Sequence, residues 1–221
     1  MTGDHGQETP HPPATAEFGA VVPGGPAHRY PDVGPLTVRK LSVGSHDNNV
    51  YVLSSGGRAL IVDGAADPDR IRAEVDGLDV VAIAQTHGHF DHVGALAELA
   101  ARLGAPVLAH PADVMPVQAQ PVSDGDRIAV GQATVEVLHT PGHTAGSVCY
   151  LSGRFLFSGD TLFPGGPGNT GGDRGAFETI MTSVDRLFAL PDETRVLPGH
   201  GLDTTIGRER PYVERWRARG W

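Results

Sequence analysis

The chain has only one cysteine, Cys149, among its 221 residues. No intrachain disulfide is therefore possible, and a reducing compartment is the expected setting. Cys149 lies in an apolar stretch typical of a strand, which predicts a buried, unreactive thiol rather than a nucleophile. The sequence also lacks any run of about 20 apolar residues, the length that a membrane helix requires. A membrane-spanning protein is thus not expected.

Basic residues are scarce as well. Lys and Arg number 17 against 26 Asp and Glu, so the net charge is −9 and the pI is about 5.6. No basic cluster precedes the C-terminal region, which argues against nucleic acid or an anionic membrane as the main partner. The N-terminus has no basic segment followed by an apolar one, so no secretory signal is expected. We predict a cytoplasmic protein, monomeric or homodimeric, with a small-molecule substrate.

Histidine, by contrast, is concentrated in one place. The segment Thr86-His87-Gly88-His89-Phe90-Asp91-His92 holds three imidazoles and one carboxylate. It follows the short apolar run 80–84, which predicts a buried strand that ends at these polar groups. Side chains two residues apart on an extended segment project to the same side, whereas Asp91 and His92 would lie on the first turn of a helix over residues 91–104. Two adjacent metal positions are therefore expected.

Imidazole and carboxylate are ligands preferred by zinc, iron and manganese. Two metals about 3.5–4 Å apart need two neighbouring sets of such ligands. The alternative is a polar loop whose histidines cap the helix and form hydrogen bonds. Three clustered histidines would then repel one another whenever they are protonated. A metal site is the better interpretation.

The same arrangement recurs at three more predicted strand ends. Strand 134–138 leads to His143, strand 155–157 leads to Asp160, and strand 195–197 leads to His200. A single histidine is more often structural than a ligand, but the joint pattern, with a glycine before each of these three residues, favours one site. Asp160 is a carboxylate well placed to bridge two metals.

The motif at 86–92, followed in order by His143, Asp160 and His200, resembles the metallo-β-lactamase superfamily, specifically its glyoxalase II-like branch. The resemblance covers about residues 35–221. It implies an α/β fold, a four-layer αββα sandwich in a single domain, with the metal site at the common edge of two sheets. We expect a flexible Pro/Gly-rich tail over residues 1–33 and a hydrolase domain over residues 34–221.

The resemblance also implies the ligand set. One metal would be held by His87, His89 and His143, and a second by Asp91, His92 and His200, with Asp160 bridging. The cofactors would be two divalent ions, zinc in the first place, with iron or manganese as alternatives. Asp91 and Asp160 are the expected catalytic carboxylates. Asp63 resembles the buried aspartate that steadies the ligand loop in this family.

The expected reaction is hydrolysis of a thioester, by attack of a metal-bridging hydroxide on a carbonyl. A β-lactamase of the common types would have Cys or Ser in place of Asp160, which disfavours that activity. A lactonase shares all seven ligands and stays open. A persulfide dioxygenase, with one iron held by the equivalents of His87, His143 and Asp160, is the runner-up, although its Gly-Arg-x-Asp-Phe segment is absent. A metal-binding module without catalysis has little support because every ligand position is filled.

Three further elements are expected from local signals. Asp67 would cap a helix that starts at Pro68 and stops at Gly77. The glycine-rich loop over residues 163–173 is either a rim over the site or a connector into a helix at 176–190. A last helix would run over residues 204–221, with Trp216 and Trp221 on the core or at a dimer contact.

Overall fold

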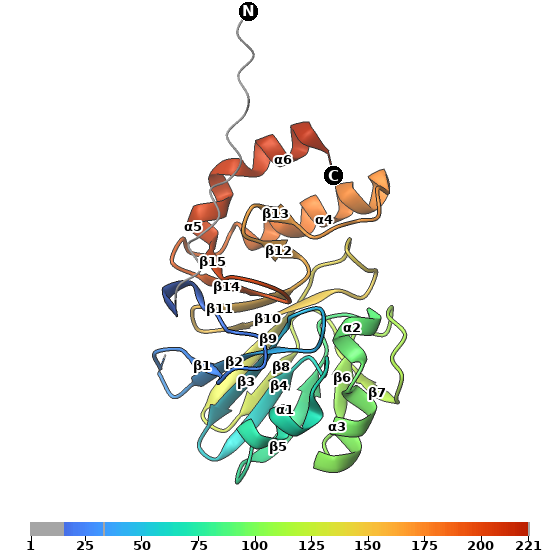
Figure 1. The fold of residues 1–221 in the computed structure, drawn as a ribbon. Coiled ribbons are helices and arrows are strands. Elements are labelled where there is room, and N and C mark those ends of the chain that lie inside the picture. The colour runs from blue at the N-terminus through green and yellow to red at the C-terminus, as the bar shows by residue number, and fades with distance from the viewer. Residues whose placement is uncertain (1–15, 33, 221) are drawn as a thin grey trace, which may run out of the picture.

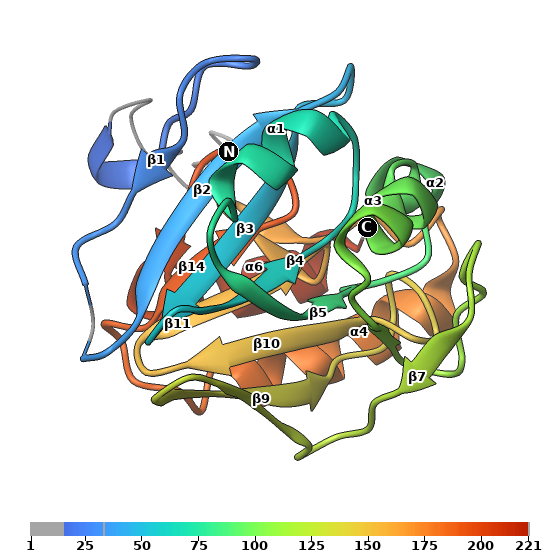
Figure 2. The same cartoon turned by 90° about the horizontal axis from the view of Figure 1, so that it is seen from below.

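Two β-sheets lie face to face, and helices cover both outer faces (Figure 1). The structure is a computed structural model that describes residues 16–32 and 34–220. Helices α1, α2 and α3 cover one sheet, and α4, α5 and α6 cover the other (Figures 1 and 2). The predicted αββα sandwich is thus confirmed.

The first sheet has seven strands in the order of the chain. Their bounds are β1 (His28–Arg29), β2 (Thr37–Val43), β3 (Asn48–Ser55), β4 (Arg58–Val62), β5 (Asp79–Ala84), β6 (Val107–Ala109) and β7 (Ala119–Pro121). Pairing is antiparallel from β1 to β4 and parallel from β4 to β7. Helix α1 joins β4 to β5, and α2 and α3 join β5 to β6, whereas a loop without a helix joins β6 to β7.

The second sheet has six strands in the order β15, β14, β11, β10, β9, β8. Their bounds are β8 (Arg127–Val130), β9 (Ala133–His139), β10 (Val148–Ser152), β11 (Phe155–Gly159), β14 (Arg195–Pro198) and β15 (Thr204–Thr205). A separate short hairpin pairs β12 (Leu162–Phe163) with β13 (Gly166–Pro167). It lies between the second sheet and the helices above it (Figure 1).

The helices are short, apart from α4. They are η1 (Ala16–Phe18), α1 (Pro68–Glu74), α2 (Phe90–Val93), α3 (Leu96–Leu103), α4 (Arg174–Leu187), α5 (Ile206–Glu209), η2 (Arg210–Tyr212) and α6 (Val213–Arg219). None of the helices in the described part of the chain combines the length and the apolar character that crossing a membrane requires.

Three apolar cores hold the four layers together. Alternate residues of β3 show how one strand serves two of them, since Tyr51 and Leu53 point between the sheets while Val50 and Val52 face α1 and α3. This follows from the two-residue period of a strand. The third core packs the outer face of the second sheet against α4 and α6. Trp216 is part of it, with 2% of its surface exposed.

The predicted helix over residues 91–104 is in fact two helices, α2 and α3. The break falls at Gly94 and Ala95, where the Ala95 N–H donates to the carbonyl oxygens of Gly64 and Ala65 at 2.9 and 3.0 Å. These tertiary bonds replace the helical bond that a continuous helix would need. Gly104, with φ 61°, ends α3 as predicted.

The predicted C-terminal helix is likewise divided, because Pro211 falls within η2 between α5 and α6. Asp67 precedes α1, but its side chain does not cap that helix. It has a φ of 51°, and its carboxylate accepts the N–H of Gly44 instead. Trp221 lies outside the described residues.

The tail that we expected to be flexible, residues 1–33, was predicted to end too late in the chain. β1 pairs with β2, and Tyr30 is 1% exposed in the core between the sheets. Phe18 also contacts the fold, because its carbonyl oxygen accepts the N–H of Asp203 at 2.9 Å. Strand pairing, burial of Tyr30 and the hydrogen bond at Phe18 therefore hold Phe18 and residues 28–30 against the domain. Residues 1–15 lie outside the described part of the chain.

Candidate metal centre

Seven polar residues from four strand ends meet at one edge of the sandwich. We call them the His–Asp cluster: His87, His89, Asp91, His92, His143, Asp160 and His200. Residues 86–92 follow β5, His143 follows β9, Asp160 follows β11 and His200 follows β14. A hydrogen bond of 2.8 Å from the Val148 N–H to the Thr86 carbonyl joins the two sheets at this place. The fold thus brings together all seven residues that the sequence predicted.

Within the cluster, ligand atoms form three overlapping groups. One consists of His87, His89 and His143, another of Asp91, His92 and His200, and a third of His87, His92 and Asp160. In each group the nitrogen and carboxylate atoms lie within 4.8 Å of one another. The first two groups match the two predicted ligand sets.

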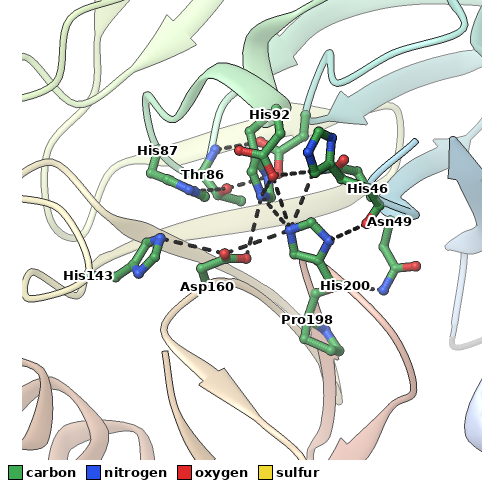
Figure 3. A network of polar contacts seen from close by, with 12 residues as sticks. His46, Asn49, Thr86, His87, His92, His143, Asp160, Pro198 and His200 are labelled. Atoms are coloured by element: carbon green, nitrogen blue, oxygen red, sulfur yellow. Dashed lines mark hydrogen bonds and ion pairs between the residues drawn. The ribbon is translucent and has the colours of Figure 1, made fainter. Parts of the chain in front are cut away.

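Asp160 lies between those two groups (Figure 3). Its Oδ2 is 3.5 Å from His143 Nε2, and its Oδ1 is 3.5 Å from His92 Nε2. Its Oδ2 is also 3.8 Å from His200 Nε2. One carboxylate therefore reaches toward both groups.

Each buried or half-buried imidazole of the cluster is held through Nδ1. His143 donates to the Asn169 carbonyl at 2.7 Å, and His200 donates to the His46 carbonyl at 3.0 Å. His92 Nδ1 lies 2.9 Å from Asp63 Oδ2. Because a partner at Nδ1 sets the tautomer, the lone pair of each Nε2 is left for a cation.

Asp63 organises the loop that carries the motif. Its carboxylate accepts the Thr86 N–H at 2.7 Å and the Thr86 hydroxyl at 2.9 Å. Since the hydroxyl proton points to Asp63, the Thr86 oxygen is left to accept from His87 Nδ1, which is 3.1 Å away. Asp63 therefore orients His92 directly and His87 through Thr86.

Three buried polar atoms of the described residues have no hydrogen-bond partner: His87 Nε2, His143 Nε2 and Asp160 Oδ1. A buried polar atom without a partner is costly, and native structures rarely tolerate one. Three such atoms at one point form an N/O donor set that suits a divalent cation. The residues of the His–Asp cluster therefore fit a metal.

Burial and local charge give the histidines different proton affinities. Burial, reinforced by the neighbouring imidazoles, holds the pKa of His87 well below its usual value. Burial also lowers the pKa of His143. For His92 burial acts in the same direction, but the hydrogen bond to Asp63 and the carboxylates nearby outweigh it and raise the pKa to about 9. A cation that binds at His92 would replace that proton beside the same carboxylates.

Two supporting residues carried no signal in the sequence. Asn48 begins β3, is 2% exposed and donates from Nδ2 to Asp91 Oδ2 at 3.0 Å. Asp113, in the loop between β6 and β7, accepts hydrogen bonds from the loops that carry His87, His89 and His143. Both contacts span distant parts of the chain, so local patterns could not identify them.

The glycine-rich loop packs directly against the cluster. A Cβ on Gly168 would lie 1.8 Å from the Asp160 carbonyl oxygen, so only glycine fits there. The next residue, Asn169, supplies the carbonyl that holds His143. This part of the loop supports a predicted ligand, a role that neither of the two expectations for the loop included.

A sequence model of the metallo-beta-lactamase superfamily matches residues 43–200, which include the whole His–Asp cluster. The probable metallo-hydrolase YqgX of Bacillus subtilis is 36% identical over an alignment of 197 positions, which covers 78% of this chain and 93% of the relative.

Two further proteins that resemble this chain carry different names. A hydroxyacylglutathione hydrolase of Xanthomonas euvesicatoria is 40% identical over 157 residues, which cover 70% of this chain but only 61% of that protein. The crystal structure of ETHE1 from Myxococcus xanthus is 32% identical with a TM-score of 0.73, covering 80% of this chain and 83% of that one.

Proposed function

This chain belongs to the metallo-beta-lactamase superfamily, and from that membership we propose that it is a binuclear metal-dependent hydrolase of the glyoxalase II type, acting on a small-molecule thioester. The observation that carries the proposal is the convergence of Nε2 and carboxylate atoms from two adjacent groups around Asp160. A site for a single ion would need only one of these groups.

In this proposal one ion would be held by His87, His89 and His143 and the other by Asp91, His92 and His200, and Asp160 would contribute to both positions. Zinc is the first expectation, with iron or manganese as alternatives. When bound, two such ions would bring the pKa of a water to about 7 and offset the negative charge that develops on a carbonyl oxygen.

The protein contributes orientation and charge. The partners at Nδ1 keep the Nε2 atoms directed at one point. Asn48 fixes one oxygen of Asp91, so that carboxylate is held in place beside His200 Nε2, which is 3.3 Å away. A thiolate leaving group needs little protonation, and therefore a site without a dedicated general acid suits a thioester.

The thioester assignment draws on the Xanthomonas relative, which is named for hydrolysis of hydroxyacylglutathione. This chain covers 61% of that protein, so the assignment extends to the reacting group and leaves the rest of the substrate open. Asp160 stands where common β-lactamases have Cys or Ser, which supports a thioester over a β-lactam.

A second candidate is a persulfide dioxygenase with one iron. The observation that favours it is that the three buried atoms without a hydrogen bond belong to His87, His143 and Asp160, the ligand set that this reaction would use. In that case Asp91 and His200 would not bind metal. The number of metal ions per chain therefore separates the two candidates.

The test is elemental analysis of protein purified without added metal, together with hydrolysis of S-lactoylglutathione. We expect about two ions per chain and measurable turnover. His87→Ala and Asp160→Ala should each reduce turnover by about 100-fold or more, because each removes a ligand. His28→Ala is the matched control, since His28 contacts Tyr30 and belongs to none of the three groups.

One iron per chain, no thioester turnover and oxygen uptake with a persulfide would replace this proposal with the dioxygenase. Full activity of either ligand variant would refute the assigned roles. Metal-free protein that hydrolyses the thioester as fast as the metal-loaded protein would refute metal catalysis altogether.

A further inference from the structure

Asp113 connects two loops of the His–Asp cluster that are distant in sequence. It lies in the loop between β6 and β7 and is half-buried. The Gly88 N–H donates to its Oδ2 at 2.8 Å, and the Thr144 hydroxyl donates to the same oxygen at 2.7 Å. The Gly146 N–H donates to its Oδ1 at 2.7 Å. Both carboxylate oxygens are therefore used.

The positions of these donors matter for the cluster. Gly88 stands between His87 and His89, and Thr144 directly follows His143. One carboxylate thus joins the loop that carries two ligands of the first group to the loop that carries the third. Three hydrogen bonds to a charged acceptor are also individually stronger than neutral ones.

Close packing limits any movement between these segments. A Cβ on Gly146 would lie 2.6 Å from Asp113 Cγ, and a Cβ on Gly88 would lie 2.9 Å from the Val114 carbonyl oxygen. Contacts this short leave no space for another side chain at either glycine. The carboxylate and the two backbone segments therefore have one mutual arrangement.

Asp113 has no part in holding the other group. Asp63 contacts His92, Asn48 contacts Asp91, and the His46 carbonyl contacts His200. No hydrogen bond of Asp113 among the described residues reaches Asp91, His92 or His200. Asp63 also reaches His87 through Thr86, so the two groups share that residue, whereas Asp113 contacts only the loops of the first group.

We propose that Asp113 is a positioning residue for the first metal group, and that it sets the affinity of that metal position without changing the affinity of the other. The inference rests on the proposed binuclear site. It goes further by assigning the relative placement of His87, His89 and His143 to one carboxylate outside the ligand set.

The variant Asp113→Asn tests this with little change in shape. Asn offers one acceptor oxygen, and its NH₂ group would face either the Gly146 N–H or the donors from Gly88 and Thr144. At least one of the three bonds is therefore lost. Two stepwise zinc affinities are measured on metal-free protein by competition with a chromophoric chelator. We expect one affinity to fall by about 10–100-fold and the other to stay unchanged.

Two further variants control for general damage. Asp124 also accepts a backbone N–H, that of His139 at 2.8 Å, but it contacts neither loop of the first group, so Asp124→Asn should leave both zinc affinities unchanged. Thr144→Val removes one donor and keeps Asp113, and it should produce a smaller loss at the same position. It also provides the test if Asp113→Asn does not fold.

The background His89→Ala identifies the position affected. This variant removes a ligand of the first group, so adding Asp113→Asn should not weaken the zinc site that remains. Equal losses at both sites, or a further loss in the His89→Ala background, would overturn the inference. If the wild-type protein binds two zinc ions and Asp113→Asn binds both with unchanged affinity, this inference alone is overturned. Wild-type protein that binds no metal would overturn the proposed function as well.

Discussion

Asp63 shows how one side chain can organise a site without being a ligand. It is 1% exposed and has a φ of 67°, a backbone conformation that residues other than glycine seldom adopt. Such a backbone costs about 1–3 kcal/mol and persists only where the surroundings hold it. Here the bonds to Thr86 and His92 hold it. The strain therefore lies beside the His–Asp cluster, where the loop must be held in one place.

Cys149 is the residue for which the structure predicts the absence of reactivity. It is fully buried, and burial raises the pKa of its thiol to about 11. Because the folded pKa lies above the ordinary value, the thiolate fraction at pH 8 is about one in a thousand. We expect a thiol-specific chromogenic disulfide reagent to label native protein very slowly at pH 8, and to label one thiol per chain quickly in denaturant.

The denatured sample is the internal control for that experiment, because the same single thiol is present. Rapid labelling of native protein at pH 8 would contradict the buried position of Cys149. Labelling that accelerates only above pH 10 would agree with the direction of the pKa shift.

At the scale of elements, strand ends determine where chemistry is possible. The residues of the His–Asp cluster lie in the segments that directly follow four strands, β5, β9, β11 and β14. β11 and β14 are parallel neighbours, so Asp160 and His200 follow adjacent ends of one sheet. The other sheet supplies residues 86–92. The cluster therefore exists only when the two sheets are stacked.

Helix α4 supports the site by packing against the loop that carries His143, where Ser183 donates to the Pro141 carbonyl. Its N-terminus is capped by Asp173, whose side chain accepts the Ala176 N–H at 2.8 Å. We expect Asp173→Ala to lower the free energy of unfolding by about 1 kcal/mol, because a helix N–H loses its acceptor. Urea unfolding followed by circular dichroism measures the difference.

Asp173→Asn is the matched variant, since Asn also caps well and lacks the charge. It should retain most of the stability. If Asp173→Asn lost as much as Asp173→Ala, the charge near the helix N-terminus rather than the hydrogen bond would be responsible.

In the whole molecule, buried charges join the two sheets. Lys40 of β2 donates to Asp203 Oδ1 at 2.9 Å, and both side chains are at most 1% exposed. Asp203 Oδ2 accepts from the Tyr30 hydroxyl at 2.8 Å and from Arg195 Nε at 3.0 Å. Asp203 lies between β14 and β15 of the second sheet, while Lys40 is in β2 of the first sheet and Tyr30 directly follows β1. A buried charge is tolerated here because each polar atom has a partner.

We predict that Lys40→Met and Asp203→Asn each lower the free energy of unfolding by about 3–5 kcal/mol, because each removes one charge of a buried ion pair. The double variant should lose less than the sum, which chemical denaturation of all four proteins would measure. The exposed pair Arg58–Asp79 is the control, and Arg58→Met should change stability by about 0–1 kcal/mol. Additive losses would show that Lys40 and Asp203 act independently.

Much of this protein followed from its sequence, because the signals were local or periodic. The apolar run 80–84 predicted the strand that leads to the site, and the spacing within 86–92 predicted several ligands on one loop. His143, Asp160 and His200 were found because each follows a predicted strand. Burial of Cys149 followed from its apolar neighbours.

Only the tertiary structure could reveal the residues that hold the ligands of the His–Asp cluster in place. Asp113 is 25 residues from Gly88 and 33 from Gly146, and Asn48 is 43 residues from Asp91. No local pattern marks such pairs, since their contact depends on how the sheets stack and where the loops cross. The same reason explains the break before Ala95, where Gly64 and Ala65 accept an N–H that a helix would otherwise use. Local sequence determines which strands and turns form, whereas long-range packing decides which distant polar groups meet.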